Sequence, residues 1–300
     1  MKKLLLGTVA LAALGVPAIA ADLGVRPVAR PIVAYTNWTG CHIGGMVGIE
    51  SGRSDGYTTN GASAITFVGP TAATPPRVAT IAAGQPLFGG FNMQGFNGGG
   101  YGGCDYQVSN WVFGVEGDWS SVNKSGQSGP GVTTFTTNLF PVGIFPGTNG
   151  EAQERWYATV RGRLGYAVDK WLFFVSGGAA WARIDSSIFG TGGPVAGLGG
   201  PVPTFFELQT DTRTGWTIGG GFDYAITNAS LMPGWSVRVE YLYMDFRNYT
   251  TFTSPTTSGV ITGPPGLVTS FVTNLDTKLT NNVVRVGFAY KFGNYAGAYR

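Results

Sequence analysis

Apolar and polar residues alternate with a period of two in eight segments of the chain, and most of these segments begin or end on aromatic residues. Such alternation, with aromatic and β-branched residues enriched, predicts β-strands that have one apolar and one polar face. The first strand is expected to begin at Trp38 and to pass through Ile43 and Val47. The other seven are expected at Gly95–Gln107, Trp111–Ser120, Arg155–Ala167, Trp171–Ile184, Arg213–Ile226, Trp235–Phe246 and Asn281–Phe292.

The connections between these strands are alternately long and short. Three of them, residues 108–110, 168–170 and 227–234, are short. Long connections at one end and short turns at the other are typical of bacterial outer-membrane barrels. The pattern therefore predicts an all-β fold, an eight-stranded antiparallel up-and-down transmembrane β-barrel with long extracellular loops and short periplasmic turns. The four long loops, rich in Gly, Thr, Ser and Pro, are expected at residues 51–94, 121–154, 185–212 and 247–280.

Charged residues within the strands fall on one face. In residues 235–246, for example, Arg238 and Glu240 share a face, and Val237, Val239 and Tyr241 share the other. Counted over five strands, the charged face holds four acids and five arginines. An enclosed interior requires such a near balance, because a buried ion that loses its partner costs about 3–5 kcal/mol. We therefore expect an interior ion network made of Glu116, Asp118, Arg161, Arg163, Arg213, Asp223, Arg238, Glu240 and Arg285.

The tryptophans sort into two belts, which indicates that the apolar face meets lipid. Amphipathic rings concentrate at the two interfaces between a membrane and water. Trp38 lies near the short turns, but its parity places it on the charged face unless the strand begins after it. The expected aromatic girdles contain Trp111, Trp171 and Trp235 toward the short turns, and Trp119, Trp156, Trp181 and Trp216 toward the long loops.

Composition and the chain ends agree with an exported membrane protein. Charged residues make up 12% of the chain, where about 25% is usual, and no basic run suggests nucleic acid. Residues 1–20 combine two lysines, an apolar stretch and a small-residue cleavage pattern, as a secretory signal peptide does. We expect a Pro-containing periplasmic linker at residues 21–37, the barrel at 38–292 and a periplasmic extension at 293–300.

Six segments of the chain carry a resemblance to a known family. They are NWTGCHIGGMVG (37–48), NWVFGVEGDWS (110–120), VRGRLGYAVDKWLFFVSGGAAWA (160–182), RTGWTIGGGFDYAI (213–226), WSVRVEYLYMDF (235–246) and VVRVGFAYKF (283–292). Together they resemble the small outer-membrane β-barrel family of alphaproteobacteria, the RopB-type, opacity-like and OmpA-like group. The resemblance implies a barrel in the outer membrane of a Gram-negative bacterium, with envelope or surface roles more often than a defined chemistry. It also implies that Tyr290 and Phe292 match the aromatic signal that the barrel-assembly machinery reads, although residues 293–300 extend beyond it.

Few residues suggest chemistry. Cys41 and Cys104 are near the short-turn ends of neighbouring strands, so they either form a cross-strand disulfide or remain two reduced small residues. His42 is the only histidine and is expected to pack inside the barrel rather than to bind a metal. Interior carboxylates such as Glu116 could serve acid–base chemistry, but pairing with arginine is favoured. The glycine-rich residues 190–200 lack the lysine and helix of a phosphate-binding loop. We expect no metal and no cofactor.

Three functions fit this architecture. The first is a structural and surface-interaction role in the cell envelope, with outer-membrane lipid and lipopolysaccharide as partners and loop ligands that the sequence does not specify. The second is a narrow porin-like passive channel for ions or small solutes. The third is a soluble ligand carrier of lipocalin type, in which the apolar face would line a cavity.

Overall fold

The computed structural model describes residues 36–58, 65–67, 77–80, 86–129, 131–137, 143–190, 205–226, 234–257 and 270–292. The expected signal peptide, the expected linker up to residue 35, the extension 293–300 and residues 191–200 lie outside the described residues. Among the described residues, no helix is long and apolar enough to cross a membrane. The strands are β1 Gly40–Thr58, β2 Ile65–Phe67, β3 Arg77–Thr80, β4 Pro86–Val108, β5 Trp111–Gln127, β6 Gly131–Thr137, β7 Gly143–Val168, β8 Trp171–Gly190, β9 Phe205–Ala225, β10 Trp235–Thr257 and β11 Ser270–Phe292.

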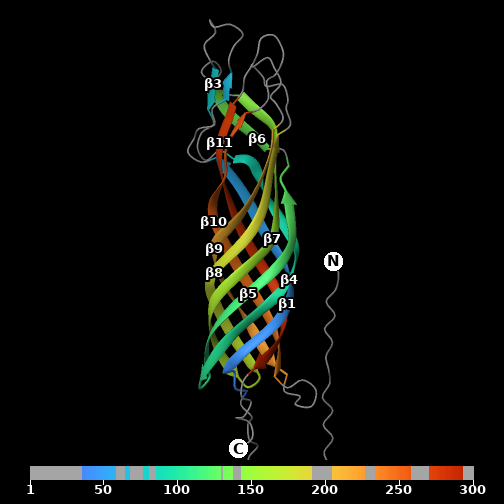
Figure 1. The fold of residues 1–300 in the computed structure, drawn as a ribbon, viewed down its shortest axis with the longest axis vertical. Helices are drawn as coiled ribbons and strands as arrows, with labels where there is room; N and C mark the ends of the chain where they lie inside the picture. Colours follow the sequence, from blue (N-terminus) through green and yellow to red (C-terminus); the bar gives the residue numbers. More distant parts are fainter. Residues whose placement is uncertain are drawn as a thin grey trace, which may run out of the picture. The chain divides into compact units, whose positions relative to one another are not determined.

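Eight of these strands close into an antiparallel barrel. Going round the barrel, the order is β1, β4, β5, β7, β8, β9, β10 and β11, and β11 pairs back with β1 to complete the ring (Figure 1). The three short strands form a ladder at one end, in which β6 pairs with β7, β3 with β6 and β2 with β3. The predicted eight-stranded antiparallel barrel is confirmed.

The strands end as predicted near the short turns but extend much further toward the long loops. β5 and β8 begin at Trp111 and Trp171, and β11 ends at Phe292, each at the residue that alternation predicts. At the other end, β7 begins at residue 143 rather than 155 and β10 continues to 257 rather than 246. A transmembrane strand needs only about 9–11 residues. The extra residues continue the backbone ladder past the length that a membrane requires. Neither face of a strand has to be apolar there, so no alternation in the sequence reveals these residues as strand.

Two of the turns are tight because their first residue adopts a left-handed backbone. β4 and β5 are joined by Ser109 and Asn110, and β7 and β8 by Asp169 and Lys170. Ser109 has φ of 55° and Asp169 of 53°, the conformation that two-residue hairpin turns require at this position. We call this side of the barrel the turn end and the opposite side the loop end.

Glycine on the inner face of β1 permits β11 to approach closely. An added Cβ at Gly44 would lie 2.4 Å from the carbonyl oxygen of Phe288, and one at Gly48 would lie 2.4 Å from that of Val284. Both distances are too short for a side chain. These glycines alternate with bulky inner residues such as Met46 and Glu50, which is how a narrow barrel fills its interior without overcrowding.

Gly48→Ala is expected to destabilise the closing β1–β11 seam, because the new methyl group must displace the β11 backbone. Overpacking of this kind costs about 1–3 kcal/mol in the free energy of unfolding. Gly45→Ala is the matched control, since a Cβ at Gly45 has its nearest neighbour at 3.8 Å. Urea unfolding in detergent micelles, followed by tryptophan fluorescence, measures both. Equal stability of the two variants would contradict the close-approach argument.

Candidate functional site

The interior of the barrel is the candidate site, because the charged residues gather there. All nine residues predicted for the ion network are buried. Large apolar side chains lie on the outside instead: Val47 is 67% exposed, Phe96 74% and Val115 65%. Apolar groups outside and ions inside are the arrangement that a barrel in lipid needs. This polarity rules out the carrier of lipocalin type.

A ring of four side chains crosses the middle of the interior. Arg161 of β7 donates to Asp118 Oδ2 at 2.9 Å and also to Glu240. Arg285 of β11 donates to Asp118 Oδ1 at 2.9 Å and lies 2.7 Å from Glu240 Oε2. Each arginine thus touches both carboxylates and each carboxylate both arginines. The four residues come from β5, β7, β10 and β11, so the ring joins opposite walls.

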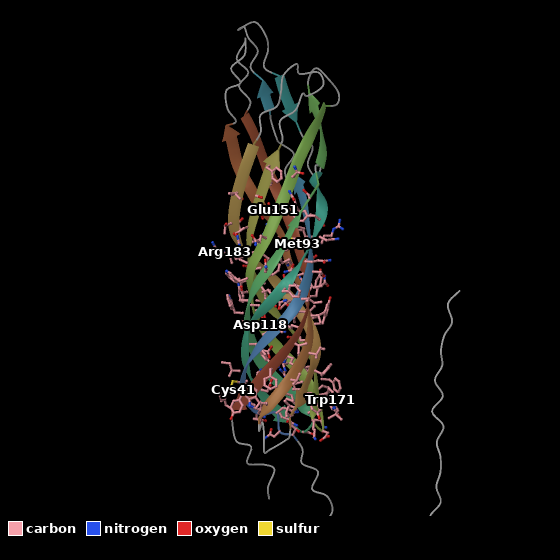
Figure 2. All side chains as sticks on the ribbon, turned by 90° about the vertical axis from the view of Figure 1, so that its right-hand side faces the viewer. Cys41, Met93, Asp118, Glu151, Trp171 and Arg183 are labelled. Carbon is pink, nitrogen blue, oxygen red and sulfur yellow. A yellow bond between two sulfur atoms is a disulfide. The ribbon has the colours of Figure 1, made fainter. Side chains whose placement is uncertain are left out.

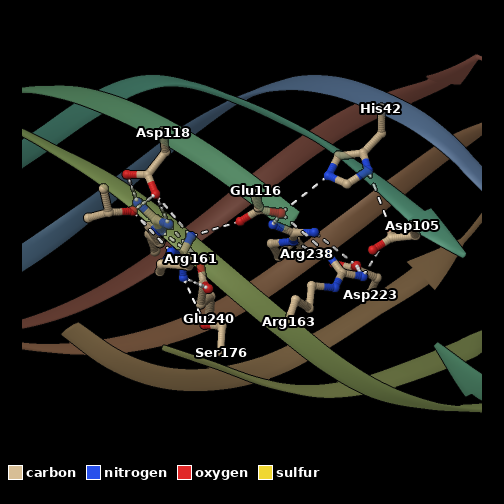
Figure 3. Close-up of polar contacts among 12 residues, drawn as sticks. His42, Asp105, Glu116, Asp118, Arg161, Arg163, Ser176, Asp223, Arg238 and Glu240 are labelled. Carbon is tan, nitrogen blue, oxygen red and sulfur yellow. Dashed lines mark hydrogen bonds and ion pairs between the residues drawn. The ribbon is translucent and has the colours of Figure 1, made fainter. Parts of the chain in front are cut away.

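Glu116 connects this ring to a second group nearer the turn end. Its Oε1 accepts a hydrogen bond from Arg161 at 2.7 Å, and its Oε2 accepts from Arg238 and, at 3.4 Å, from Arg163. Asp223 accepts from Arg163 at 2.7 Å and from Arg238 at 2.6 Å. Figure 3 shows Glu116 between the two groups, which together form one continuous network.

His42 extends the network, with a residue that sequence reasoning missed. The His42 ring lies 3.2 Å from Glu116 Oε2 and 3.5 Å from Asp105 Oδ2. Asp105 is on the inner face of β4, where alternating glycines conceal the polarity of the face in the sequence. Among the described residues, no group of His, Cys, Asp and Glu could hold a metal ion. The polar contacts of His42 that the structure shows are with these two interior carboxylates.

A separate polar layer toward the loop end was also missed. Lys124 Nζ lies 2.7 Å from Glu50 Oε1 and 2.5 Å from Glu154 Oε2, and it donates to Asn281 Oδ1 at 2.8 Å. Lys124, Glu154 and Asn281 are completely buried. The sequence placed Lys124 in a loop, although it continues the inner parity of Glu116 and Asp118. Arg213, the ninth predicted member, is buried and donates to Thr277 Oγ1 at 2.6 Å.

Apolar side chains fill the interior on either side of the ions. Trp38 precedes β1, so it is not bound by the strand's alternation, and it packs inside the turn end against Val112, Ala167 and Leu172. Its backbone N–H donates to Gln107 Oε1 at 2.6 Å. The cluster in the loop-end half consists of Phe91, Met93, Val122, Ala152, Tyr157, Ala180, Ala182, Ile184, Ile188, Leu242, Met244, Phe246, Leu279 and Val283.

A disulfide joins Cys41 and Cys104, which lie directly opposite each other in the β1–β4 pair with a Cα–Cα distance of 3.9 Å. Both cysteines are exposed on the outer wall at the turn end, where Figure 2 labels Cys41. The bond lies outside the ion network. It links the first two long strands of the barrel.

Two tryptophans of the outer wall are separated by the height expected for a lipid-facing apolar band. Trp171 and Trp181 are ten residues apart on β8. With a rise of about 3.4 Å per residue and a tilt of about 40°, this step spans about 25 Å, the height of the apolar band of an outer-membrane barrel. At the turn end, Trp235 stacks on Phe288 with ring centroids 4.7 Å apart. The other girdle tryptophans are Trp111, Trp119, Trp156 and Trp216, and the predicted signal residues Tyr290 and Phe292 make a ring contact at 5.2 Å.

The geometry determines what the interior can do. Carboxylates such as Glu116, Asp118 and Glu240 are each bound by at least two arginines. Hydrogen bonds between two ionised groups are among the strongest that side chains form. The charged groups therefore bind one another, and they cross-link opposite strands instead of facing a substrate.

Asp118→Asn is expected to lower the free energy of unfolding by about 3–5 kcal/mol, because it leaves the buried Arg161 and Arg285 with one carboxylate fewer. Asp185→Asn is the matched control: Asp185 lies on the outer wall, is 28% exposed and pairs with Arg155 at 2.6 Å. An exposed pair contributes only about 0–1 kcal/mol. Urea unfolding measures both variants, and a similar loss in the two would refute a stabilising role of the interior network.

Known proteins resemble this chain along almost its entire length. A family model described as "outer membrane protein beta-barrel domain" matches residues 6–292. The 31 kDa outer-membrane immunogenic proteins of Brucella melitensis biotype 1 and Brucella suis biovar 1 are each 28% identical over 302 residues, covering 97% of this chain and all of theirs.

Solved structures include the outer membrane protein OprG from Pseudomonas aeruginosa, 14% identical with a TM-score of 0.37, covering 88% of this chain and 100% of that one. The outer membrane protease OmpT from Escherichia coli is 9% identical with a TM-score of 0.42, covering 84% of this chain and 97% of that one. From the match of the family model, together with inside-out polarity and barrel closure, we conclude that the chain belongs to the outer membrane protein β-barrel family and lies in the outer membrane of a Gram-negative bacterium.

Proposed function

We propose that this protein is a sealed structural barrel that supports the cell envelope and presents its loop end to the surroundings. The single observation that carries the proposal is the filled interior. Apolar side chains occupy both ends, and a continuous ion network occupies the middle. Eight strands leave an interior just wide enough for side chains to fill, and buried side chains are present here from the turn end to the loop-end half.

Cross-links between distant strands support a mechanical role. Arg285 of β11 binds Asp118 of β5, and Arg161 of β7 binds Glu240 of β10. In each pair the strands are not neighbours in the barrel. The ion pairs therefore resist flattening of the barrel in the plane of the membrane, which backbone ladders between adjacent strands do not. No catalytic step is part of the proposal, because the carboxylates that could donate protons are held by arginines.

Two further observations support a role at the cell surface. The strands continue past the loop-end tryptophans, so the wall of the barrel extends beyond the lipid. The two Brucella relatives are named as immunogenic proteins of the outer membrane, which is consistent with parts of those proteins that the host meets. We therefore place the loop end of this chain at the cell surface in the proposal.

Planar-bilayer conductance tests the proposal directly. The wild-type protein is expected to carry little stable current, and Arg161→Ala and Arg285→Ala are each expected to increase the leak. Removing either guanidinium opens a gap and leaves the ring of two carboxylates with a single arginine, so the leak is expected to favour cations. The matched control is Arg53→Ala, because Arg53 lies on the outer wall with 60% of its side chain exposed.

Heat-modifiable migration on a gel first establishes that each variant is folded. Large, stable single-channel currents from the wild-type protein would replace this proposal with the narrow channel. If the two interior variants conducted no more than Arg53→Ala, the ion network would not be the seal, and that part of the proposal would be refuted.

A further inference from the structure

We propose that Arg155 and Arg183 form a binding site for the phosphate of an anionic lipid headgroup on the outer wall of the barrel. The site lies just beyond the loop-end tryptophans. The inference rests on the location of the barrel in the outer membrane and is independent of whether the interior is sealed.

The height of the two arginines places them among lipid headgroups. Arg183 follows Trp181 by two residues on the outer face of β8, and Figure 2 shows it well above Trp171 and Cys41 at the turn end. Two residues of a tilted strand rise about 5 Å. Because Trp181 marks the edge of the apolar band, a side chain about 5 Å further reaches the polar layer next to it.

A β-bulge brings Arg155 to the same place. Glu154 pairs with Ile184 and Trp156 pairs with Arg183, so Arg155 is the additional residue on β7. Glu154 and Tyr157 are both completely buried inside the barrel. The bulge therefore lets two consecutive residues, Arg155 and Trp156, face outward together, which regular alternation forbids. Bulges commonly re-aim a side chain in this way.

Asp185 orients the Arg155 guanidinium and leaves most of its donors available. Arg155 Nε donates to Asp185 Oδ2 at 2.6 Å, and Thr210 Oγ1 donates to Asp185 Oδ1 at 2.8 Å. The Arg155 side chain is 50% exposed, and the structure shows no partner for its Nη groups among the described residues. A guanidinium held at Nε presents its Nη donors in a fixed direction. Fixed, planar donors suit phosphate better than a flexible ammonium does.

The local charge favours an anion. Arg155 pairs with one carboxylate, Asp185, and Arg183 lies two residues before Asp185 on the same face of β8. The next acid on β7, Glu151, lies opposite Ser187 further toward the loop end. Arg53 on the far wall differs, because its Nε lies 3.1 Å and 3.2 Å from the two oxygens of Asp55. Its charge is matched by one carboxylate, so Arg53 offers a control that has the same residue type and outer face.

The outer wall here has a cationic part, formed by Arg155 and Arg183, and an apolar part below it. An amphiphilic lipid would contact both parts, whereas a free anion would contact only the cationic part. Toward the turn end, the same strands expose an apolar wall, in which Val160 is 58% and Val175 60% exposed. Acyl chains can cover this wall while the phosphate lies on Arg155 and Arg183. We therefore assign the site to a phosphorylated lipid of the leaflet at the loop end.

The test uses the full-length barrel in phosphatidylcholine nanodiscs with or without bis-phosphorylated lipid A. Wild type, Arg53→Ala, Arg183→Ala and the double variant Arg155→Ala with Arg183→Ala are compared by native mass spectrometry and by the midpoint of thermal unfolding. Lipid A is expected to remain bound to wild type and Arg53→Ala and to raise their midpoints. The affinity of the double variant is expected to fall at least about tenfold, and that of Arg183→Ala by less.

Three outcomes would overturn the proposal. The double variant could retain as much lipid A as wild type, or Arg53→Ala could lose as much as the double variant. Inorganic phosphate added to phosphatidylcholine discs could also raise the midpoint as far as lipid A does, which would show a site for a free anion. All the substituted side chains lie on the outer wall, so conductance through the interior is a separate measurement and the two proposals can fail independently.

Discussion

Buried ions need partners of opposite charge, and the arrangement of this barrel depends on that constraint. Arg161 and Arg285 are almost fully buried, and each touches both Asp118 and Glu240. Burying one such ion without a partner costs several kcal/mol. The strands that carry them must therefore keep one register around the whole ring, because a shift by one residue would turn every interior ion toward lipid. The same register therefore keeps the ions paired in the interior and the apolar side chains exposed on the outer wall.

Space inside the barrel is the second constraint, and glycine provides it. Large guanidiniums fit into a narrow interior only where neighbouring inner positions are small. Gly44 and Gly48 leave this room on β1 and also let β11 approach closely enough to close the ring. The high glycine content of the chain, 49 of 300 residues, is consistent with this geometry rather than with disorder.

The outer wall can carry a binding site without any change to the interior ion network. The β-bulge at Arg155 changes neither the network nor the closure of the barrel, yet it places a guanidinium beside Arg183 at the edge of the lipid. The polar wall beyond the tryptophans exists because the strands are longer than the membrane requires. The proposed interaction with lipid headgroups and the proposed presentation at the cell surface both depend on that excess length.

Alternation with a period of two is a local property, so the sequence alone determined the number of strands in the barrel, their inner and outer faces, and their limits at the turn end. It also predicted nine of the buried charged residues, from Glu116 to Arg285. It could not show which ions pair, because Asp118 meets Arg285 only once the ring has closed across 167 residues. Asp105 and Lys124 escaped notice because glycines or loop-like composition concealed their parity. The loop-end limits of the strands and the bulge at Arg155 were decided by the tertiary structure, since backbone pairing beyond the lipid leaves no hydrophobic pattern in the chain.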